Sequence, residues 1–434
     1  MRTRLTNCEV MDPSKGERFW GYVEWEDGVI KDVGHAGPGL DDAGSGDSSR
    51  IVDGRGHLLA PSFVDLFADF CEPGFEYRED VASGSAAAAS GGYTFVCLDP
   101  ETDPVCDGAD TARFILDRGA DAGLVDLSPC GAISKGMKGG SIANLGELSD
   151  LGLRCVGTGN RYVKDTGFLR HAMEYAGNFG LLVVLTSEDP DLAQGSVHEG
   201  LVSTVTGLRA TPAAAEEVAV ARHIALCELT GTPTHLLKLS SEAGVRLVRE
   251  ARQRGVPMTA SVTAHHLVLT DTAVQTFDPQ FKVIPPLRTE ADRRALVAGL
   301  SDGTLSCIVS DHGPRAVEDK DVEFDSAAAG ASGLELTFPL VNSLVLSGEL
   351  TLDVALGALG PGPRLALGLD GGKIAADEPA DLVLLDKSVA WKAEASSLES
   401  RGKNTVAGGR TLVGRPVMTI RRGEVTYNRL SGNK

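Results

Sequence analysis

The chain has 434 residues, of which 42% are hydrophobic and 23% are charged, a composition that supports a large folded core and excludes global disorder. Asp and Glu outnumber Lys and Arg by 60 to 41, so the net charge is -19. A surface this acidic repels phosphate backbones and anionic lipids. Neither nucleic acid nor a membrane is therefore an expected partner.

The N-terminal sequence and the cysteines indicate a cytoplasmic protein. The first residues, MRTRLTNCEVMD, carry two arginines without an apolar segment behind them, so a signal peptide is not expected. The eight cysteines are scattered and include no C-x-x-C pair. This pattern is typical of reduced, buried thiols and not of a disulfide framework.

Both ends of the chain carry short strand patterns. Residues 3–10 and 22–33 alternate apolar and polar side chains, with a turn at Asp27 and Gly28. A Gly-, Ser- and Asp-rich stretch, residues 36–50, is expected to be an exposed loop. Residues 380–385 and 416–427 again resemble strands. We expect residues 1–56 and 375–434 to form one small β-sandwich domain.

The middle of the chain, residues 57–374, predicts an α/β fold of the (β/α)8 barrel type. Eight apolar, β-rich runs alternate with helical segments, as in parallel strands buried on both faces. One predicted helix covers residues 212–229, with Thr211 as N-cap and Pro212 in its first turn. A doubly wound open sheet is the alternative, but its usual Gly-rich phosphate turn is not visible. The eight runs are residues 58–66, 93–98, 124–127, 154–158, 181–186, 235–239, 258–262 and 305–310.

Several motifs, in order along the chain, closely resemble the dihydroorotase family of the amidohydrolase superfamily. They cover nearly the whole chain and begin with APSFVDLFADFCEPGFEYRED. The resemblance implies a metal-dependent barrel that opens or closes the cyclic amide of dihydroorotate, with zinc in its active members. The later motifs include SKGMKGG, SEDPDL, HHLVLTD, FKVIPPLRTEADRRAL, SDHGP, GASGLE and GGKIAADEPADLVLLD.

The metal site that this resemblance implies has a defined set of ligands. Divalent metals polarise the amide carbonyl and activate water. The expected ligands are a His-x-His pair on strand one, a carboxylate on strand four, histidines on strands five and six, and an Asp on strand eight. Residues i and i+2 of a strand point to the same side, so both histidines of the pair can face the barrel mouth.

Most of these positions are degenerate here. Only Asp311, in SDHGP, keeps the implied residue type, and we interpret it as vestigial. We therefore predict that the chain holds no metal and no zinc cofactor. The degenerate metal positions are Phe67 and Asp69 on strand one, Thr158 on strand four, Thr186 on strand five and Lys238 on strand six.

Three substrate positions implied by the resemblance also differ. Cys71 stands where an arginine would grip a carboxylate, Glu101 replaces one asparagine and Ile284 replaces another. A carboxylated substrate is thus expected to lose its cation and to meet a like charge at Glu101.

The most specific structural hypothesis from the sequence concerns Lys238. A buried ammonium is costly without a partner, so we expect it to occupy the former metal volume and to pair with Asp311, Asp69 or both. The alternative is that its side chain extends outward to water. The adjacent His265 and His266 are expected on a strand, pointing to opposite sides, and not as a ligand pair.

The sequence therefore predicts a non-catalytic dihydroorotase-like protein of pyrimidine biosynthesis. The resemblance implies assembly with aspartate carbamoyltransferase in a hetero-oligomer, where the role of such relatives is structural. Two alternatives stay open. One is an active cyclic-amide hydrolase (a dihydroorotase) with an atypical metal site, which would hold stoichiometric metal and lose its activity on Asp311→Ala. The other is a regulator that binds a small molecule in the retained pocket.

Overall fold

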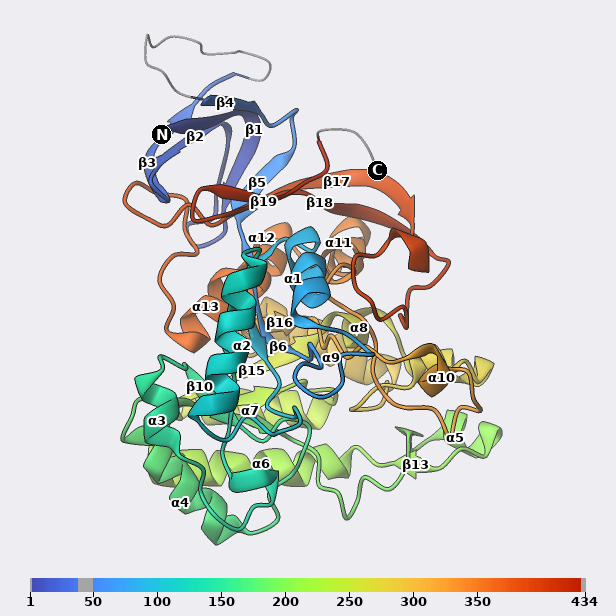
Figure 1. Ribbon diagram of the computed structural model, residues 1–434. Helices are drawn as coiled ribbons and strands as arrows, with labels where there is room; N and C mark the ends of the chain where they lie inside the picture. The colour runs from blue at the N-terminus through green and yellow to red at the C-terminus, as the bar shows by residue number, and fades with distance from the viewer. Residues whose placement is uncertain (1, 38–49, 431–434) are drawn as a thin grey trace.

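A computed structural model describes residues 2–37 and 50–430 of the chain (Figure 1). Most of the predicted loop at residues 36–50 lies outside these ranges. Strands from the two ends of the chain gather at one pole of the molecule, and the barrel with its helices fills the rest. The eight cysteines are all free and buried, as predicted. No helix in the described ranges has the length and apolarity needed to cross a membrane.

The terminal strands form one sheet, in the order β19-β18-β17-β5-β1-β2-β3, with β4 paired to β1. The N-terminal and C-terminal halves meet where β17 runs antiparallel to β5, with Leu382 opposite Pro61. The predicted pairing of the two ends is thus confirmed. The strands are β1 (Thr3–Asp12), β2 (Glu17–Glu26), β3 (Val29–His35), β4 (Arg50–Asp53), β5 (Leu58–Pro61), β17 (Leu382–Lys392), β18 (Thr411–Arg421) and β19 (Glu424–Asn428).

The first predicted barrel run, residues 58–66, is divided between two sheets. Its first half is β5 of the terminal sheet, and its second half begins the barrel strand β6 (Phe63–Ala68). Between them, the Ser62 amide donates to the Asp381 carbonyl at 3.0 Å, which ties the junction to the start of β17. The division into residues 1–56 plus 375–434 and residues 57–374 stays our proposal for the domains.

The remaining strands are parallel and follow one another around the (β/α)8 barrel, as the sequence predicts. A parallel bridge between Ala68 and His312 links the first strand to the segment after the last. β8 and β9 are separated by Cys130 alone and continue one strand position. The strands after β6 are β7 (Tyr93–Leu98), β8 (Asp126–Pro129), β9 (Gly131–Ala132), β10 (Cys155–Gly157), β11 (Leu182–Thr186), β14 (Thr234–Leu237), β15 (Met258–Thr263) and β16 (Cys307–Val309).

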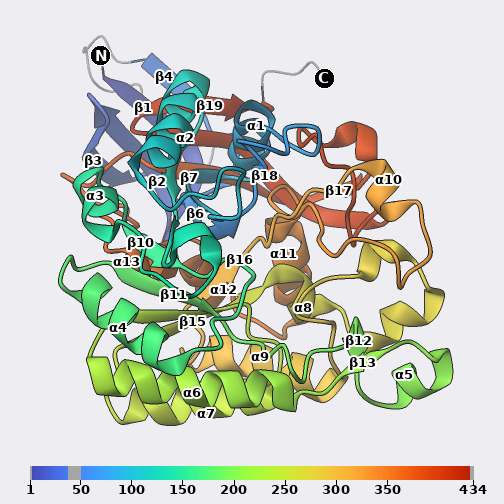
Figure 2. The ribbon, with the colours of Figure 1, turned by 60° about the horizontal axis from the view of Figure 1, so that its bottom comes forward.

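Helices cover the outside of the barrel, and Figure 2 shows α6 and α7 side by side on its outer face. The longer helices are α1 (Val81–Ser90), α2 (Ala109–Ala122), α4 (Thr166–Gly177), α6 (Ala214–Thr230), α7 (Glu242–Gln253), α9 (Glu290–Ser301), α11 (Thr337–Ser347) and α12 (Leu352–Leu359). The shorter helices are α3 (Leu145–Asp150), α5 (Leu201–Thr206), α8 (Ala264–Val268), α10 (Val317–Lys320) and α13 (Pro361–Leu367). Two strands of two residues each, β12 (Val197–His198) and β13 (Ala210–Thr211), pair with each other outside the barrel.

Two local predictions are wrong. Thr211 does not cap α6, because it lies in β13 and its hydroxyl donates to the Gly195 carbonyl at 2.8 Å. Ala213 takes the N-cap position without a side-chain hydrogen bond. His265 and His266 lie in the short helix α8, capped by the Thr263 hydroxyl, and not on a strand. The capping residue Thr263 ends β15 and turns the chain into α8.

Candidate active site

Six of the residues singled out in the sequence line one cavity of about 330 Å³ at the carboxyl ends of the barrel strands. Chemistry on this fold takes place at that end, because the loops after the strands converge there. The cavity brings six of the nine predicted site residues together. The six are Phe67, Asp69, Glu101, Lys238, Ile284 and Asp311.

Lys238 and Asp311 form a buried ion pair. The Lys238 ammonium donates to Oδ1 of Asp311 at 2.9 Å and to Oδ1 of Asn160 at 2.7 Å. The side chains are 3% and 9% exposed, so solvent screens the attraction weakly. The hypothesis that Lys238 pairs with Asp311 is confirmed, and the alternative in which it extends to water is wrong.

Phe67 also contributes to binding this cation. The Lys238 ammonium lies 4.7 Å from the centroid of the Phe67 ring. The face of an aromatic ring carries negative electrostatic potential and attracts a cation at this range. Phe67 has no lone pair for a metal, but it stabilises the ammonium that occupies the neighbouring volume.

Both members of the ion pair have an unusual backbone. Lys238 follows β14 with φ of 56°, and Asp311 follows β16 with φ of 48°. Non-glycine residues rarely adopt this left-handed region, and such strain is common at functional sites. The neighbouring Ser310 donates its amide to Asp65 at 3.2 Å, and burial raises the pKa of Asp65 to about 7. These contacts fix the loop that carries Asp311.

The second oxygen of Asp311 faces His265. The distance from Oδ2 to Nε2 of His265 is 3.8 Å, too long for a hydrogen bond, and Nε2 is buried without a partner in the described residues. Burial, with a smaller contribution from the Lys238 charge, lowers the pKa of His265 to about 3. The imidazole is therefore neutral at neutral pH and adds no second positive charge beside Asp311.

Two arginines that the sequence analysis did not single out also line the cavity, namely Arg78 and Arg315. Nη1 of Arg315 lies 3.8 Å from Asp69, and Arg78 lies 3.6 Å from Asp319, at distances beyond a close hydrogen bond. Since Cys71 stands at the position of the implied arginine, these two residues supply the cations that were expected to be missing.

Glu101 is held by its own partners. One carboxylate oxygen accepts the Asn160 amide at 2.7 Å, and the other lies 3.3 Å from Nε of Arg161. Behind it, burial raises the pKa of Asp99 well above its usual value, with Glu101 as the next cause. The expected repulsion between Glu101 and a substrate carboxylate is thus reduced by the Arg161 cation.

Three predicted site residues lie outside this cavity. Thr158 lines a neighbouring one, and the Thr186 hydroxyl donates to the Gly159 carbonyl at 2.5 Å. Cys71 is buried, and its amide donates to Asp69 at 2.7 Å. Thr158 and Thr186 therefore shape the loop that presents Asn160, and Cys71 orients the Asp69 carboxylate.

The residues of the cavity do not fit the two-metal centre that the resemblance implies. No group of three or more His, Cys, Asp and Glu side chains in the described ranges is arranged to hold a metal ion. Asp69 and Asp311 each interact with a cationic side chain, Arg315 at 3.8 Å and Lys238 at 2.9 Å. We therefore assign no ligand set for a metal and derive below only what the side chains of the chain do.

Comparisons with known proteins place this barrel in a family. A family model described as "Dihydro-orotase-like" matches residues 56–243. A dihydroorotase of Anaeromyxobacter sp. (strain K) is 42% identical over 421 residues, which cover 96% of each chain. The chain belongs to the dihydroorotase family. A dihydroorotase of Geobacter sp. (strain M21) is 39% identical and covers 98% of this chain and 99% of its own.

Solved structures confirm the fold of this dihydroorotase-family chain. The L-hydantoinase (dihydropyrimidinase) of Arthrobacter aurescens superposes with a TM-score of 0.86 at 22% identity, covering 98% of this chain and 96% of that one. The dihydropyrimidinase of Brevibacillus agri NCHU1002 gives 0.82 at 21% identity, covering 99% and 95%. At this identity the likeness shows the barrel and the added β domain, not the reaction.

These comparisons correct two predictions made from the sequence. The prediction that the chain is not an enzyme is wrong, because relatives about 40% identical over nearly its full length are named dihydroorotase. The prediction that it has no cofactor is wrong for the same reason, since metal dependence is what kinship with this family implies. Both errors came from treating the loss of individual ligands as the loss of the activity.

Proposed function

We propose that the protein is a cyclic-amide hydrolase of the dihydroorotase type with an atypical site. The family membership supports the reaction class. The observation that carries the proposal is that one cavity holds the Lys238–Asp311 pair together with Arg78 and Arg315. A proton acceptor, a fixed cation and two carboxylate-binding cations are the groups that opening a carboxylated cyclic amide requires.

The proposed chemistry assigns one role to each partner of the ion pair. Asp311 accepts a proton from water as the water oxygen attacks the amide carbonyl carbon. The Lys238 ammonium donates a hydrogen bond to the carbonyl oxygen as that oxygen gains negative charge. Asp311 then returns the proton to the ring nitrogen while the carbon–nitrogen bond breaks, which leaves a free ureido group and a carboxylic acid that releases its proton to solvent and becomes a carboxylate.

The proposed substrate carries a carboxylate on its ring. Guanidinium groups bind carboxylates through paired hydrogen bonds, and Nη2 of Arg315 donates to no residue in the described part of the chain. Because Arg315 follows Asp311 by four positions, the same loop sets the distance between the substrate carboxylate and the reacting amide.

A comparison of two substrates tests this proposal. Purified protein is assayed for ring opening with dihydroorotate and with dihydrouracil, which lacks the carboxylate. We expect kcat/KM to be at least about a hundredfold higher for dihydroorotate, the loss typical of removing a charge-assisted contact. Equal values for the two rings would reject the carboxylate assignment, and no turnover of either would reject the reaction class.

We also propose that the chain assembles with aspartate carbamoyltransferase, as the sequence resemblance implies. The test is co-elution of the two purified proteins on a sizing column, with each protein alone as the control. A shift of both proteins to one larger species supports the partnership. Separate elution at micromolar concentrations of both would contradict it.

A further inference from the structure

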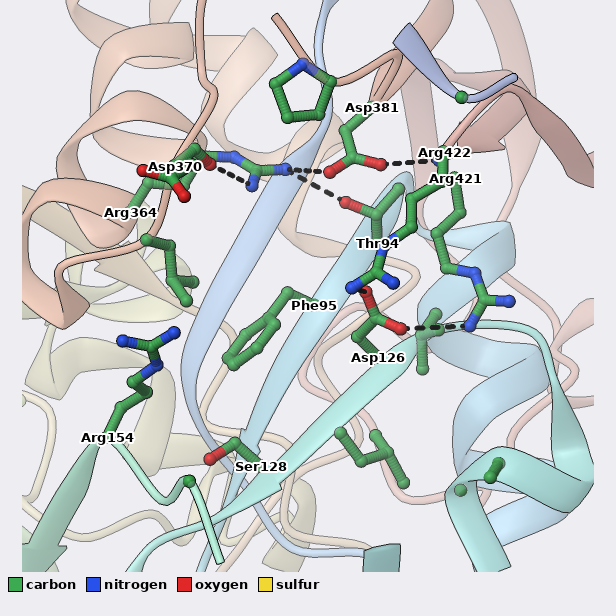
Figure 3. A pocket seen from close by; sticks show the side chains of 18 of the residues that line it. Thr94, Phe95, Asp126, Ser128, Arg154, Arg364, Asp370, Asp381, Arg421 and Arg422 are labelled. Atoms are coloured by element: carbon green, nitrogen blue, oxygen red, sulfur yellow. Dashed lines mark hydrogen bonds and ion pairs between the residues drawn. The ribbon is translucent and has the colours of Figure 1, made fainter. Parts of the chain in front are cut away.

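A second cavity, of about 670 Å³, lies at the opposite end of the barrel (Figure 3). Thr94 and Phe95 at the start of β7 and Asp126 at the start of β8 line it. The candidate active site instead uses residues that follow the ends of strands, so the two cavities are separate. The second has about twice the 330 Å³ of the first.

Both structural parts contribute walls to this cavity. The terminal sheet supplies the turn between β2 and β3 at Gly28, the residue Asp381 before β17 and the turn between β18 and β19 at Arg422. The barrel supplies β7, β8, α2 and the segment after α13. Small-molecule sites occur preferentially where two such units meet. Apolar residues such as Phe95 and Leu116 line the cavity beside the charged ones, which suits a ligand with both a charged and an apolar end.

Most charged groups of the cavity are satisfied by each other. Asp126 accepts from Arg421 at 3.2 Å and lies 3.0 Å from Nη2 of Arg422. Asp381 accepts from Nη2 of Arg364 at 3.3 Å and from the Arg422 amide at 2.7 Å. Figure 3 shows these pairs on the side of the terminal sheet. This network of ion pairs neutralises the charges of the two carboxylates, although Nε of Arg364 and of Arg421 has no hydrogen-bond partner among the described residues.

Three charged groups among the described lining residues stand outside this network, and one of them is the exposed Asp377 carboxylate. The described residues provide no hydrogen bond or ion pair to the Arg154 guanidinium, nor to the Asp370 carboxylate, although both side chains line the cavity. The Phe95 ring, partly exposed, lies in the same space. In Figure 3 the Arg154 and Asp370 side chains lie on the same side of Phe95. Among the described residues the cavity thus offers the Arg154 cation, an aromatic surface and two carboxylates, of which Asp370 lies on the same side of Phe95 as Arg154.

We propose that this cavity binds a free α-amino acid with an aromatic side chain. Its carboxylate binds Arg154, its ammonium binds Asp370 and its ring packs against Phe95. An α-amino acid carries opposite charges on adjacent groups, and each forms a charge-assisted hydrogen bond with its counterpart in the cavity. Aromatic rings pack favourably against one another in offset or edge-on arrangements. An aromatic side chain is therefore the kind that would make the most of the Phe95 ring.

Calorimetric titration of the full chain tests the proposal with L-phenylalanine and L-tryptophan, and with the N-acetyl and amide derivatives of each. The derivatives remove the ammonium and the carboxylate in turn. We expect saturable binding of the free amino acids and at least about tenfold weaker binding of each derivative. Equal binding of the derivatives, or no saturable binding of the free amino acids up to about 10 mM, overturns the proposal.

Matched variants locate the site. Arg154→Gln and Asp370→Asn change exposed side chains, and each is expected to weaken binding about tenfold or more. The controls are Arg113→Gln and Asp117→Asn, exposed positions on α2 outside the cavity, which are expected to bind as the wild type does. The Asp370→Asn variant should bind the N-acetyl derivative no more weakly than it binds the free amino acid, because the variant has no carboxylate to bind the ammonium. Wild-type affinity in Arg154→Gln would overturn the proposal.

Discussion

The ammonium of Lys238 lies 4.7 Å above the ring of Phe67, so two residues at positions expected to hold metal ligands bind each other instead. The barrel mouth therefore keeps a positive charge at its centre, supplied by a side chain. The same ammonium donates to Asp311, and this pair is the basis of the predictions that follow.

The contact between Phe67 and Lys238 predicts a measurable coupling energy. In a double-mutant cycle of Phe67→Leu and Lys238→Met, urea denaturation should give a coupling of roughly 1 kcal/mol, the range of a desolvated cation–aromatic pair. The control is Phe338→Leu, a buried ring that stacks on Phe63 and not on a cation. It should show no coupling to Lys238→Met, and equal coupling in both cycles would contradict the assignment.

The ion pair predicts an unequal effect of single and double substitutions on stability. Lys238→Met leaves the buried Asp311 carboxylate without its cation, and we expect the free energy of unfolding to fall by about 3 kcal/mol. The double variant Lys238→Met/Asp311→Leu removes both charges and should recover most of that loss. Chemical denaturation measures both. A double variant less stable than Lys238→Met would show that the broken ion pair is not the main cause of the lost stability.

Arg315 is predicted to bind substrate and not to take part in bond breaking. Arg315→Gln should raise KM for dihydroorotate about tenfold, with a much smaller change in kcat, because the lost contact is made in the ground state as well. Arg170→Gln, which changes an exposed arginine paired with Glu174 on α4, is the control. A large fall in kcat at unchanged KM would place Arg315 in the chemical step.

The buried His235 predicts a specific pH dependence of stability. Burial lowers the pKa of His235 from 6.5 to about 3, and its Nδ1 lies 2.8 Å from the Thr259 hydroxyl. Below pH 6.5 the unfolded chain takes up a proton that the native chain does not, so stability is lost as pH falls from about 6.5 towards 3. Between pH 7 and pH 5, the wild type should lose about 2 kcal/mol more than His235→Asn. Parallel stability curves would contradict this.

The sequence predicts the strands of the barrel and the meeting of Lys238 with Asp311 for one reason. Lys238 directly follows β14 and Asp311 lies two residues after the end of β16, and the ends of parallel strands are brought together by the fold itself. Arg78 and Arg315 could not be found in this way, because they lie on loops whose paths depend on tertiary contacts. Thr211 shows the same limit, since its hydroxyl is used by Gly195 and not by the helix that follows.

The role of Phe67 also depended on information that single positions do not contain. An aromatic residue in place of a histidine indicates the loss of a metal ligand. Only the position of the Lys238 ammonium over the ring shows that the change preserves a cation in the cavity. Reading each degenerate position by itself led to the incorrect prediction of an inactive protein.

The central claim is that Asp311 moves the proton during ring opening, and its most direct test is the rate of dihydroorotate turnover by the wild type and by Asp311→Asn. Asp191→Asn, an exposed position paired with Lys164, is the matched control. We predict steady turnover by the wild type and the control, and a rate at least about a hundredfold lower for Asp311→Asn. Turnover by Asp311→Asn at the wild-type rate, or a folded wild type that opens no dihydroorotate with or without added zinc, would contradict the account.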